Sequence, residues 1–406
     1  MRALRLILLA ACLLVAWPGC SQSQRSPDEV ILWTGFESEL PTLIRLANEF
    51  SAQSGKTVRV VKVPFQRLRD KYLIAAPAGQ GPDLLIGPQD WVGILKTAGL
   101  LEPLPPEALP RSEEFLPVTI EALTFQGQLY AVPLVAQCVA LIRNPELIPR
   151  SPANLEEMAR MASELPPQPG RYGIYWELKD LYFTWPIFAT HGAYLFGTRD
   201  GQLNPEDLGL DNPGAQRAGE FLRRLTAEGL VPSDATTDLA RSLYLERRAA
   251  MTVNGPWFLK DLRQAGVPYV IEPVPGLGEA PAPCLVTVEG VMLNNRAIAR
   301  QASLDFLKFL ATPQAQVEIA LASGRPPANR LALEQAGRDP QVGPDLLAFA
   351  RVVEAGIPMP NHPAVSAVWE DMKQTVELIT KGEVQPSVQL PLTRQRIQKR
   401  IRQMME

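Results

Sequence analysis

The chain has 406 residues, enough for two domains of ordinary size, since single domains usually run about 100 to 200 residues. Its hydrophobic content of 46% and charged content of 20% are those of a folded globular protein and exclude a disordered or fibrous chain. The formal net charge of −3, without a basic stripe, argues against a nucleic-acid partner.

The first 20 residues have the pattern of a secretory signal peptide, with two arginines before an apolar run over 6–17. Cys20 and the polar residues after it predict lipidation at Cys20 and a tether over 21–28. Plain secretion is the alternative, because Trp17 stands where lipoprotein signals prefer a leucine-like residue. The mature protein is therefore expected in the periplasm or on the outer face of the cytoplasmic membrane.

Strand and helix patterns alternate from the start of the mature chain. The expected elements, in order, are strand 30–33, helix 43–50, strand 58–63, helix 67–76, strand 84–86 and helix 91–98. Such repeats predict a largely parallel sheet with helices on both faces, and ligands bind such sheets beyond the carboxyl ends of the strands. Glu37 and Asp90 follow strand ends and are predicted at that edge.

A second lobe is predicted to begin near Cys138. Asn212-Pro213 predicts the N-cap and first residue of a helix that ends at Gly229. The apolar segment 281–294 predicts a strand that returns toward the first lobe, and the basic amphipathic pattern over 393–404 predicts a terminal helix with a solvated face.

Cys138 and Cys284 are the cysteines that remain outside the signal region, and they form either one disulfide or two buried thiols. His191 and His362 are the only histidines, which is too few for a metal site or a nucleophile triad. No metal and no cofactor is expected.

Three aromatic residues stand in motifs that do not resemble ordinary core: Tyr182 within 180–186, Trp257 within 251–257, and Trp369 after Met359-Pro360-Asn361. Flat aromatic faces beside carboxylates and amides suit a sugar, which has apolar faces and a rim of hydroxyls. Trp33 and Trp185 are assigned to the core.

At these motifs, and at Gly81-Pro82-Asp83, the chain resembles the periplasmic maltose- and maltodextrin-binding proteins, extracellular solute-binding proteins of ATP-driven (ABC) sugar importers. The resemblance implies an α/β, two-lobe periplasmic-binding-protein fold of type II, each lobe a mostly parallel sheet flanked by helices. Hinge strands are then expected to cross near Gln137, 286–289 and 334–340. The implied lobes are 29–136 plus 290–337 and 137–289 plus 338–406.

The resemblance also implies a ligand site between the lobes. Its expected binding residues are Glu37, Asp90, Trp91, Gln137, Asp180, Tyr182, Trp257 and Trp369. Glu39 could serve in place of Glu37. Further candidates are Arg69, Thr237, Glu289 and Lys373.

Several positions depart from the maltose binders, and these departures indicate that the first-lobe side of the cleft is rebuilt. Gly87 replaces a tryptophan, Trp91 an arginine, Gln137 a glutamate and Lys373 an arginine, while Thr237 replaces a tyrosine and Arg69 an acid. A compact glucosyl ligand such as trehalose, sucrose or glucosylglycerol therefore competes with linear maltodextrin, and Trp91 is expected to replace the aromatic face lost at Gly87.

The implied function is a monomeric receptor that closes around a sugar and delivers it to the membrane permease of an ABC importer. A secreted glycosidase that uses two of Glu37, Asp90 and Asp180 is a distant alternative, because no catalytic motif supports it. Capture of a non-sugar ligand such as a polyamine or a metal is the third alternative and would need a carboxylate-rich cage or clustered tyrosine and histidine ligands.

Overall fold

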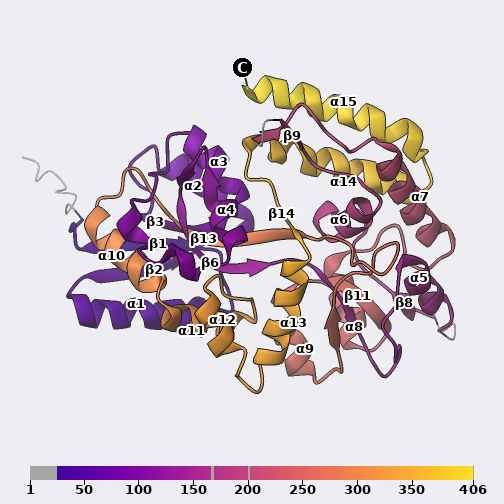
Figure 1. Cartoon of the computed structure of the whole chain (residues 1–406), viewed down its shortest axis with the longest axis horizontal. Helices are drawn as coiled ribbons and strands as arrows, with labels where there is room; N and C mark the ends of the chain where they lie inside the picture. The colour runs from indigo at the N-terminus through magenta and orange to yellow at the C-terminus, as the bar shows by residue number, and fades with distance from the viewer. Residues whose placement is uncertain (1–24, 166–168, 200–201, 406) are drawn as a thin grey trace, which may run out of the picture.

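The computed structural model describes residues 25–165, 169–199 and 202–405. The predicted signal segment with Cys20 lies outside these residues. The described chain forms two lobes that lie side by side, each built on its own sheet (Figure 1).

The first lobe contains a six-stranded sheet in the order β2-β1-β3-β13-β6, with β14 beside the first residues of β13. Its strands are β1 (Glu29–Thr34), β2 (Thr57–Lys62), β3 (Leu84–Pro88), β6 (Ala131–Gln137), β13 (Leu285–Leu293) and β14 (Ile357–Pro358). β1 pairs with β2 and β3 in parallel, whereas β13 is antiparallel to both β3 and β6.

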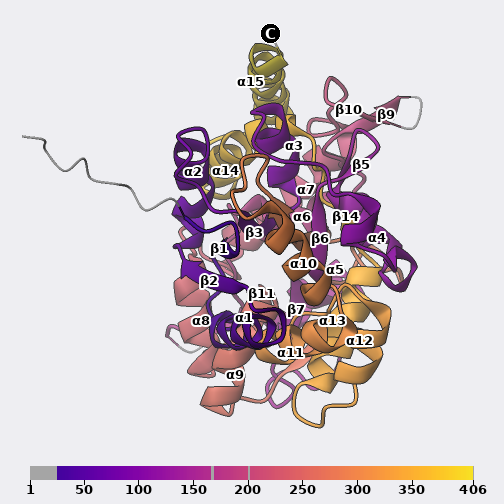
Figure 2. The same cartoon turned by 90° about the vertical axis from the view of Figure 1, so that its left-hand side faces the viewer.

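Helices cover both faces of this sheet, as the alternating strand pattern predicts. Trp33 and Leu85 point toward the side of α2 (Phe65–Ala75), α3 (Asp90–Thr97) and α4 (Pro117–Leu123). Leu32 and Leu84 point toward the side of α1 (Leu40–Ser54), α10 (Arg300–Leu310) and α11 (Pro313–Ser323). Figure 2 shows α1 on one side of β1 and β2 and the helices α2 and α3 on the other. Trp33 and Trp185 are both buried, which confirms their assignment to the core.

The second lobe has a four-stranded sheet in the order β12-β7-β11-β8. Its strands are β7 (Ala140–Arg143), β8 (Tyr172–Ile174), β11 (Ala249–Asn254) and β12 (Val270–Glu272). The helices around it are α5 (Leu155–Ser163), α6 (Leu181–Thr190), α7 (Pro213–Ala227), α8 (Thr237–Leu245), α9 (Leu259–Ala265), α14 (Ser366–Thr380) and α15 (Pro386–Met405). Two short hairpins, β4 (Thr124–Phe125) with β5 (Gln128–Leu129) and β9 (Gly197–Arg199) with β10 (Gln202–Asn204), complete the described strands.

Both sheets are mixed, which refines the prediction of mostly parallel sheets. In the second lobe β8 is parallel to β11, whereas β7 lies between β11 and β12 and is antiparallel to both. β7 follows β6 after only two residues, so it enters its sheet from the first lobe and runs opposite to its neighbours. Local periodicity carries no information about that direction.

The chain passes between the lobes at the end of β6, before β13, and again after α12 (Arg330–Ala336), where α13 (Gly343–Glu354) packs against β12. Asn361 then returns to the first lobe, because its Nδ2 donates to the carbonyls of Ala122 and Thr124 at 2.9 and 2.7 Å. The lobe boundaries implied by the resemblance stay a prediction. That prediction did not include the contact of Asn361 with the first lobe.

The side chain of Gln89, the residue after β3, forms hydrogen bonds to β13 and to the segment after β14 where the lobes meet. Its buried side chain donates from Nε2 to the carbonyls of Val286 and Met359, at 3.0 and 3.2 Å. Its Oε1 accepts the backbone N–H of Val288. The residue after β3 is thereby attached to β13 and to the segment that follows β14.

The motif Gly81-Pro82-Asp83 has a structural role. The buried Asp83 carboxylate accepts the backbone N–H groups of Ile31 and Ala299 at 2.8 and 3.1 Å and pairs with Arg25. A side chain at residue 81 would collide with Ala76, since a Cβ there would lie 2.8 Å from that residue's Cα.

The helix starting at Asn212-Pro213 is confirmed as α7, because the Asn212 side chain accepts the N–H of Ala215 at 2.8 Å. The predicted start of the last helix at residue 393 was wrong, since α15 begins at Pro386 and continues through Pro391. Pro391 removes one hydrogen bond of the helix and crowds the preceding turn, and burial of Leu390, Ile397 and Ile401 against α14 and α7 offsets that cost.

Cys138 and Cys284 are both buried and free in the structure, as in the second of the two alternatives. Burial raises the pKa of the Cys138 thiol, and the Cys284 thiol raises it further. Among the helices of the described residues, none is both long and apolar enough to cross a membrane.

Candidate functional site

Three aromatic rings of the second lobe form one cluster. The ring centroid of Trp257 lies 6.4 Å from that of Tyr182 and 6.0 Å from that of Phe183. All three side chains are half-buried, so each ring packs on the core and keeps part of its surface exposed. The structure therefore brings Tyr182 and Trp257 together as expected, and it adds Phe183, which the sequence analysis had passed over within its own motif.

The turn after β11 determines where the Trp257 indole lies. β11 ends at Asn254, and a single 3-10 turn over Pro256–Phe258 follows Gly255. A Cβ at Gly255 would lie only 2.2 Å from the indole, so only glycine allows the ring to fold back over this turn. The Asn254 side chain accepts the Gly255 N–H at 2.8 Å and stabilises the turn.

Tyr182 is placed by the start of α6. The Asp180 carboxylate caps this helix by accepting the Tyr182 N–H at 2.9 Å. Burial raises the pKa of Asp180, and the nearby Glu177 carboxylate adds to the effect. The cap occupies one carboxylate oxygen, so Asp180 has a structural task besides any contact with a ligand.

The aromatic cluster reaches the strands that connect the lobes. The Thr287 hydroxyl of β13 donates to the Tyr182 hydroxyl at 3.1 Å. Thr287 is the register partner of Gln137 on β6, and Glu289 follows two residues later on the same strand. Cross-strand partners and alternate residues share a face of a sheet, so these polar side chains lie beside the aromatic cluster.

Gln137, Glu289 and Asp90 form a polar group at this edge of the first-lobe sheet. Gln137 and Glu289 are buried, and Nε2 of Gln137 donates to Oε1 of Glu289 at 3.3 Å. Oε1 of Gln137 and Oδ1 of Asp90 are buried and have no hydrogen-bond partner in the described part of the chain. Unpaired buried acceptors are costly, and they mark positions that a donor of a ligand can fill.

The charges around this group nearly cancel. Burial raises the pKa of Glu289 to about 8 and the pKa of Asp90 to about 6. Arg325 lowers the first value and Arg69 the second. Glu39 is buried and pairs with Arg325 at 2.6 Å. At neutral pH two guanidinium groups therefore face about two carboxylates, an environment for an uncharged polar ligand rather than for a cation.

Trp91 occupies the space beside Gly87. A Cβ at Gly87 would lie 2.5 Å from the indole of Trp91, so the two replacements are sterically linked. Trp91 is 5% exposed and its ring is stacked on Phe65, with centroids 5.4 Å apart. Phe65 is 46% exposed, so it offers the accessible aromatic face in this part of the first lobe. Sequence reasoning did not identify Phe65, because no local pattern shows that it stacks on Trp91.

Trp369 and Lys373 lie one turn apart on the same face of α14. Trp369 is half-buried, and Lys373 is close enough to Asp180 to lower the pKa of that carboxyl. This face of α14 therefore points toward the start of α6.

Two candidates lie in other surroundings. The Glu37 side chain is 77% exposed and pairs with Lys62 at 2.7 Å, and this partner lowers its pKa. The Thr237 hydroxyl and N–H donate to Glu177 at 2.8 and 3.0 Å, which stabilises the start of α8.

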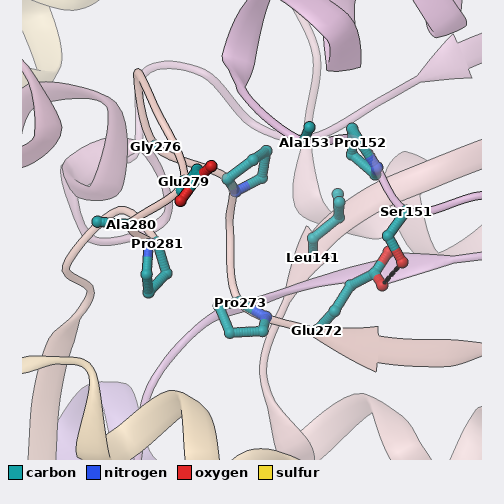
Figure 3. A pocket seen from close by; sticks show the side chains of 11 residues that line it. Leu141, Ser151, Pro152, Ala153, Glu272, Pro273, Gly276, Glu279, Ala280 and Pro281 are labelled. Carbon is teal, nitrogen blue, oxygen red and sulfur yellow. Dashed lines mark hydrogen bonds between the residues drawn. The ribbon is translucent and has the colours of Figure 1, made fainter.

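A separate recess of about 310 Å³ lies on the second lobe (Figure 3). It is lined by Pro152, Pro273 and Pro281 among others, with Glu272 held by Arg143 at 2.7 Å. None of the predicted ligand-binding residues lines it. Within the described residues, no group of three or more histidine, cysteine or acidic side chains is placed to hold a metal ion.

Comparisons with known proteins agree with this architecture. A protein-family profile described as "Bacterial extracellular solute-binding protein" matches residues 45–343. A solved structure, the Thermus thermophilus maltotriose binding protein bound with maltotriose, superposes with a TM-score of 0.82 at 31% identity and covers 92% of this chain and 100% of its own.

Two curated relatives extend the similarity. The maltotriose-binding protein of Pyrococcus abyssi is 29% identical over 374 residues, 89% of this chain and 79% of the relative. A maltooligosaccharide ABC transporter solute-binding lipoprotein of Streptococcus pneumoniae is 22% identical over 324 residues, 77% of this chain and 75% of the relative. The two-lobe fold of type II expected from the sequence is thereby confirmed.

Proposed function

The chain belongs to the bacterial extracellular solute-binding proteins, and from this premise we propose that it is the sugar receptor of an ABC importer. Its ligand is a maltodextrin or a related glucosyl sugar, held between the Tyr182, Phe183 and Trp257 rings of the second lobe and the polar group at the edge of the first-lobe sheet. The relatives' own names support this proposal, since they are maltotriose and maltooligosaccharide binders.

One observation carries the proposal: exposed parts of an aromatic cluster adjoin buried acceptors that lack hydrogen-bond partners within the described chain. A pyranose ring covers an aromatic face with its C–H groups and offers hydroxyl donors at its rim. Oε1 of Gln137 and Oδ1 of Asp90 are acceptors that have no partner among the residues that the structure describes, so they match those donors.

The mechanism follows from the position of the site. A ligand that touches α6 and the turn after β11 on one lobe, and Asp90 and Gln137 on the other, binds the closed arrangement more tightly than the open one. It therefore shifts the population toward closure, which a permease can recognise. The permease partner, the monomeric state and the lipid anchor at Cys20 are parts of this proposal, and the lipoprotein relative supports the anchor.

The first-lobe side favours a compact ligand as the alternative to a linear one. Trp91 is buried beneath Phe65 and cannot supply the face missing at Gly87. A wall that is aromatic mainly on the second lobe accommodates one or two glucosyl units, as in trehalose, sucrose or glucosylglycerol.

Isothermal titration calorimetry with maltose, maltotriose, trehalose, sucrose and glucosylglycerol tests the proposal. We expect at least one sugar to bind, and Trp257→Ala to weaken its binding by about 2 kcal/mol, ~30-fold in Kd, because a central aromatic contact is lost. Trp33→Phe is the matched control, since Trp33 is a core tryptophan on β1 and should leave Kd unchanged.

Binding of none of the five sugars, or equal affinity of the Trp257→Ala variant, would contradict the assignment. Incubation with maltose and a glucose assay test the enzyme alternative, because a receptor releases no glucose.

A further inference from the structure

Gln137 and Glu289 are buried side chains at the junction of the lobes, and one hydrogen bond joins them. Gln137 is 7% exposed and Glu289 is 5% exposed, on the antiparallel strands β6 and β13. Nε2 of Gln137 donates to Oε1 of Glu289, and Oε1 of Gln137 has no partner in the described residues.

The surroundings of Glu289 decide its protonation state. Asp90 at the start of α3, Glu39 at the start of α1 and Tyr182 of α6 face it, with Arg325 after α11 as the cation. Burial raises the pKa of Glu289 to about 8, the two carboxylates add to this effect, and Arg325 opposes it without cancelling it. Glu289 is therefore mostly a neutral carboxylic acid at pH 7, with its proton available as a donor.

We propose that Glu289 and Gln137 form a donor and acceptor pair that binds one hydroxyl group of an uncharged ligand, and that loss of the Glu289 proton weakens this binding. The hydroxyl donates to Oε1 of Gln137 and accepts the Glu289 proton. A hydroxyl is the small polar group that both donates and accepts, so it satisfies both members of the pair. This inference rests on the proposed sugar receptor and names the protonation state in which its site works.

The sign of the pH effect follows from the donor role. Ionised Glu289 has no proton for the ligand oxygen and faces the Asp90 and Glu39 carboxylates, so the complex favours the protonated form. Affinity is then full well below pH 8 and falls as the pH rises through that value. Between pH 7 and pH 9 we expect Kd to rise about tenfold. A cationic ligand such as a polyamine would show the opposite trend, because an ammonium group prefers the carboxylate.

Calorimetry with maltotriose, or with whichever sugar of the panel binds, tests this from pH 6.5 to 9. The wild type should lose about tenfold between pH 7 and 9, whereas Glu289→Gln, which keeps a donor of similar shape, should bind with a flat pH profile. Glu334→Gln is the matched control, since this acid is 64% exposed on α12 and should keep the wild-type slope. Gln137→Leu should weaken binding about tenfold at pH 7, because the hydroxyl loses its acceptor.

A second readout uses the wild type alone, in case a variant does not fold. Titrations at pH 8.5 in buffers of different ionisation enthalpy should show uptake of about 0.8 proton per bound sugar, the fraction of Glu289 ionised at that pH. A flat wild-type profile without proton uptake, or an unchanged slope in Glu289→Gln, would overturn this inference while the receptor function stands. Binding of no sugar at any pH would instead overturn the receptor function itself.

Discussion

Replacing Gln89 by leucine should lower the free energy of unfolding, because the side-chain hydrogen bonds of Gln89 at the junction between the lobes are lost. The Val288 N–H would lose the side-chain acceptor that now satisfies it, and the Met359 carbonyl would lose its contact with Nε2. The Val286 carbonyl would suffer less, because it also accepts the Met359 N–H at 3.0 Å. An unpaired buried backbone group costs about 1–3 kcal/mol, so we expect a loss of about 2–4 kcal/mol.

Urea unfolding without ligand, followed by tryptophan fluorescence, measures this difference. Gln53→Leu is the matched control, because Gln53 is exposed on α1 and its side chain bonds to the exposed Glu49 one turn away, so the change in unfolding free energy should stay within about 0.5 kcal/mol. The Gln89→Glu variant should also be less stable than the wild type, since a carboxylate would place an oxygen against the Val286 and Met359 carbonyls. Equal unfolding free energies for the Gln89→Leu and Gln53→Leu variants would refute the bridging role.

Two further predictions concern the site. Gly255→Ala should push the Trp257 indole from its place, because the new Cβ would lie 2.2 Å from the ring, and we expect sugar binding at least ~10-fold weaker with a loss of stability of about 1–3 kcal/mol. Unchanged Kd by calorimetry would count against this account. Burial holds the pKa of Asp90 at about 6, above the unfolded value, so its charge costs stability above pH 6 and the cost disappears as the pH falls toward 4. Asp90→Asn should therefore stabilise the protein at pH 7.5 by about 1–3 kcal/mol while weakening sugar binding. If the midpoint temperature of thermal unfolding does not rise in this variant, the Asp90 charge does not cost stability.

The sequence predicted those parts of the structure that depend on local pattern. Short apolar runs and apolar residues at helical spacing predicted β1 to β3 and the helices between them, and the cap at Asn212 predicted the start of α7. The motifs around Tyr182 and Trp257 correctly indicated that these rings lie together, because each ring is oriented by its own short turn. The binding role of these residues stays a prediction.

The contacts between distant parts of the chain were not predictable in this way. Arg325 pairs with Glu39, which is 286 positions away, and Phe65 covers the indole that was expected to face the ligand. Neither contact can be predicted from the periodicity or the spacing of residues in the sequence, since each depends on how separate helices and strands pack against one another. The sequence named Glu289 as a further candidate for the ligand site, but only its surroundings in the folded chain show why it holds its proton.

The insertion of β13 into the first sheet has a consequence for synthesis. Strands β1 and β3 lie among the first 90 residues to be made, but the strand beside β3 and the helices α10 and α11 over Leu32 and Leu84 come from residues 285–323. In a nascent chain that ends before residue 285, the edge of the sheet at β3 lacks its β13 neighbour, and of the three helices α1, α10 and α11 only α1 is present to cover the apolar face. The ribosome must therefore complete most of the polypeptide before the first core can close, and folding is postponed by topology rather than by weak local structure.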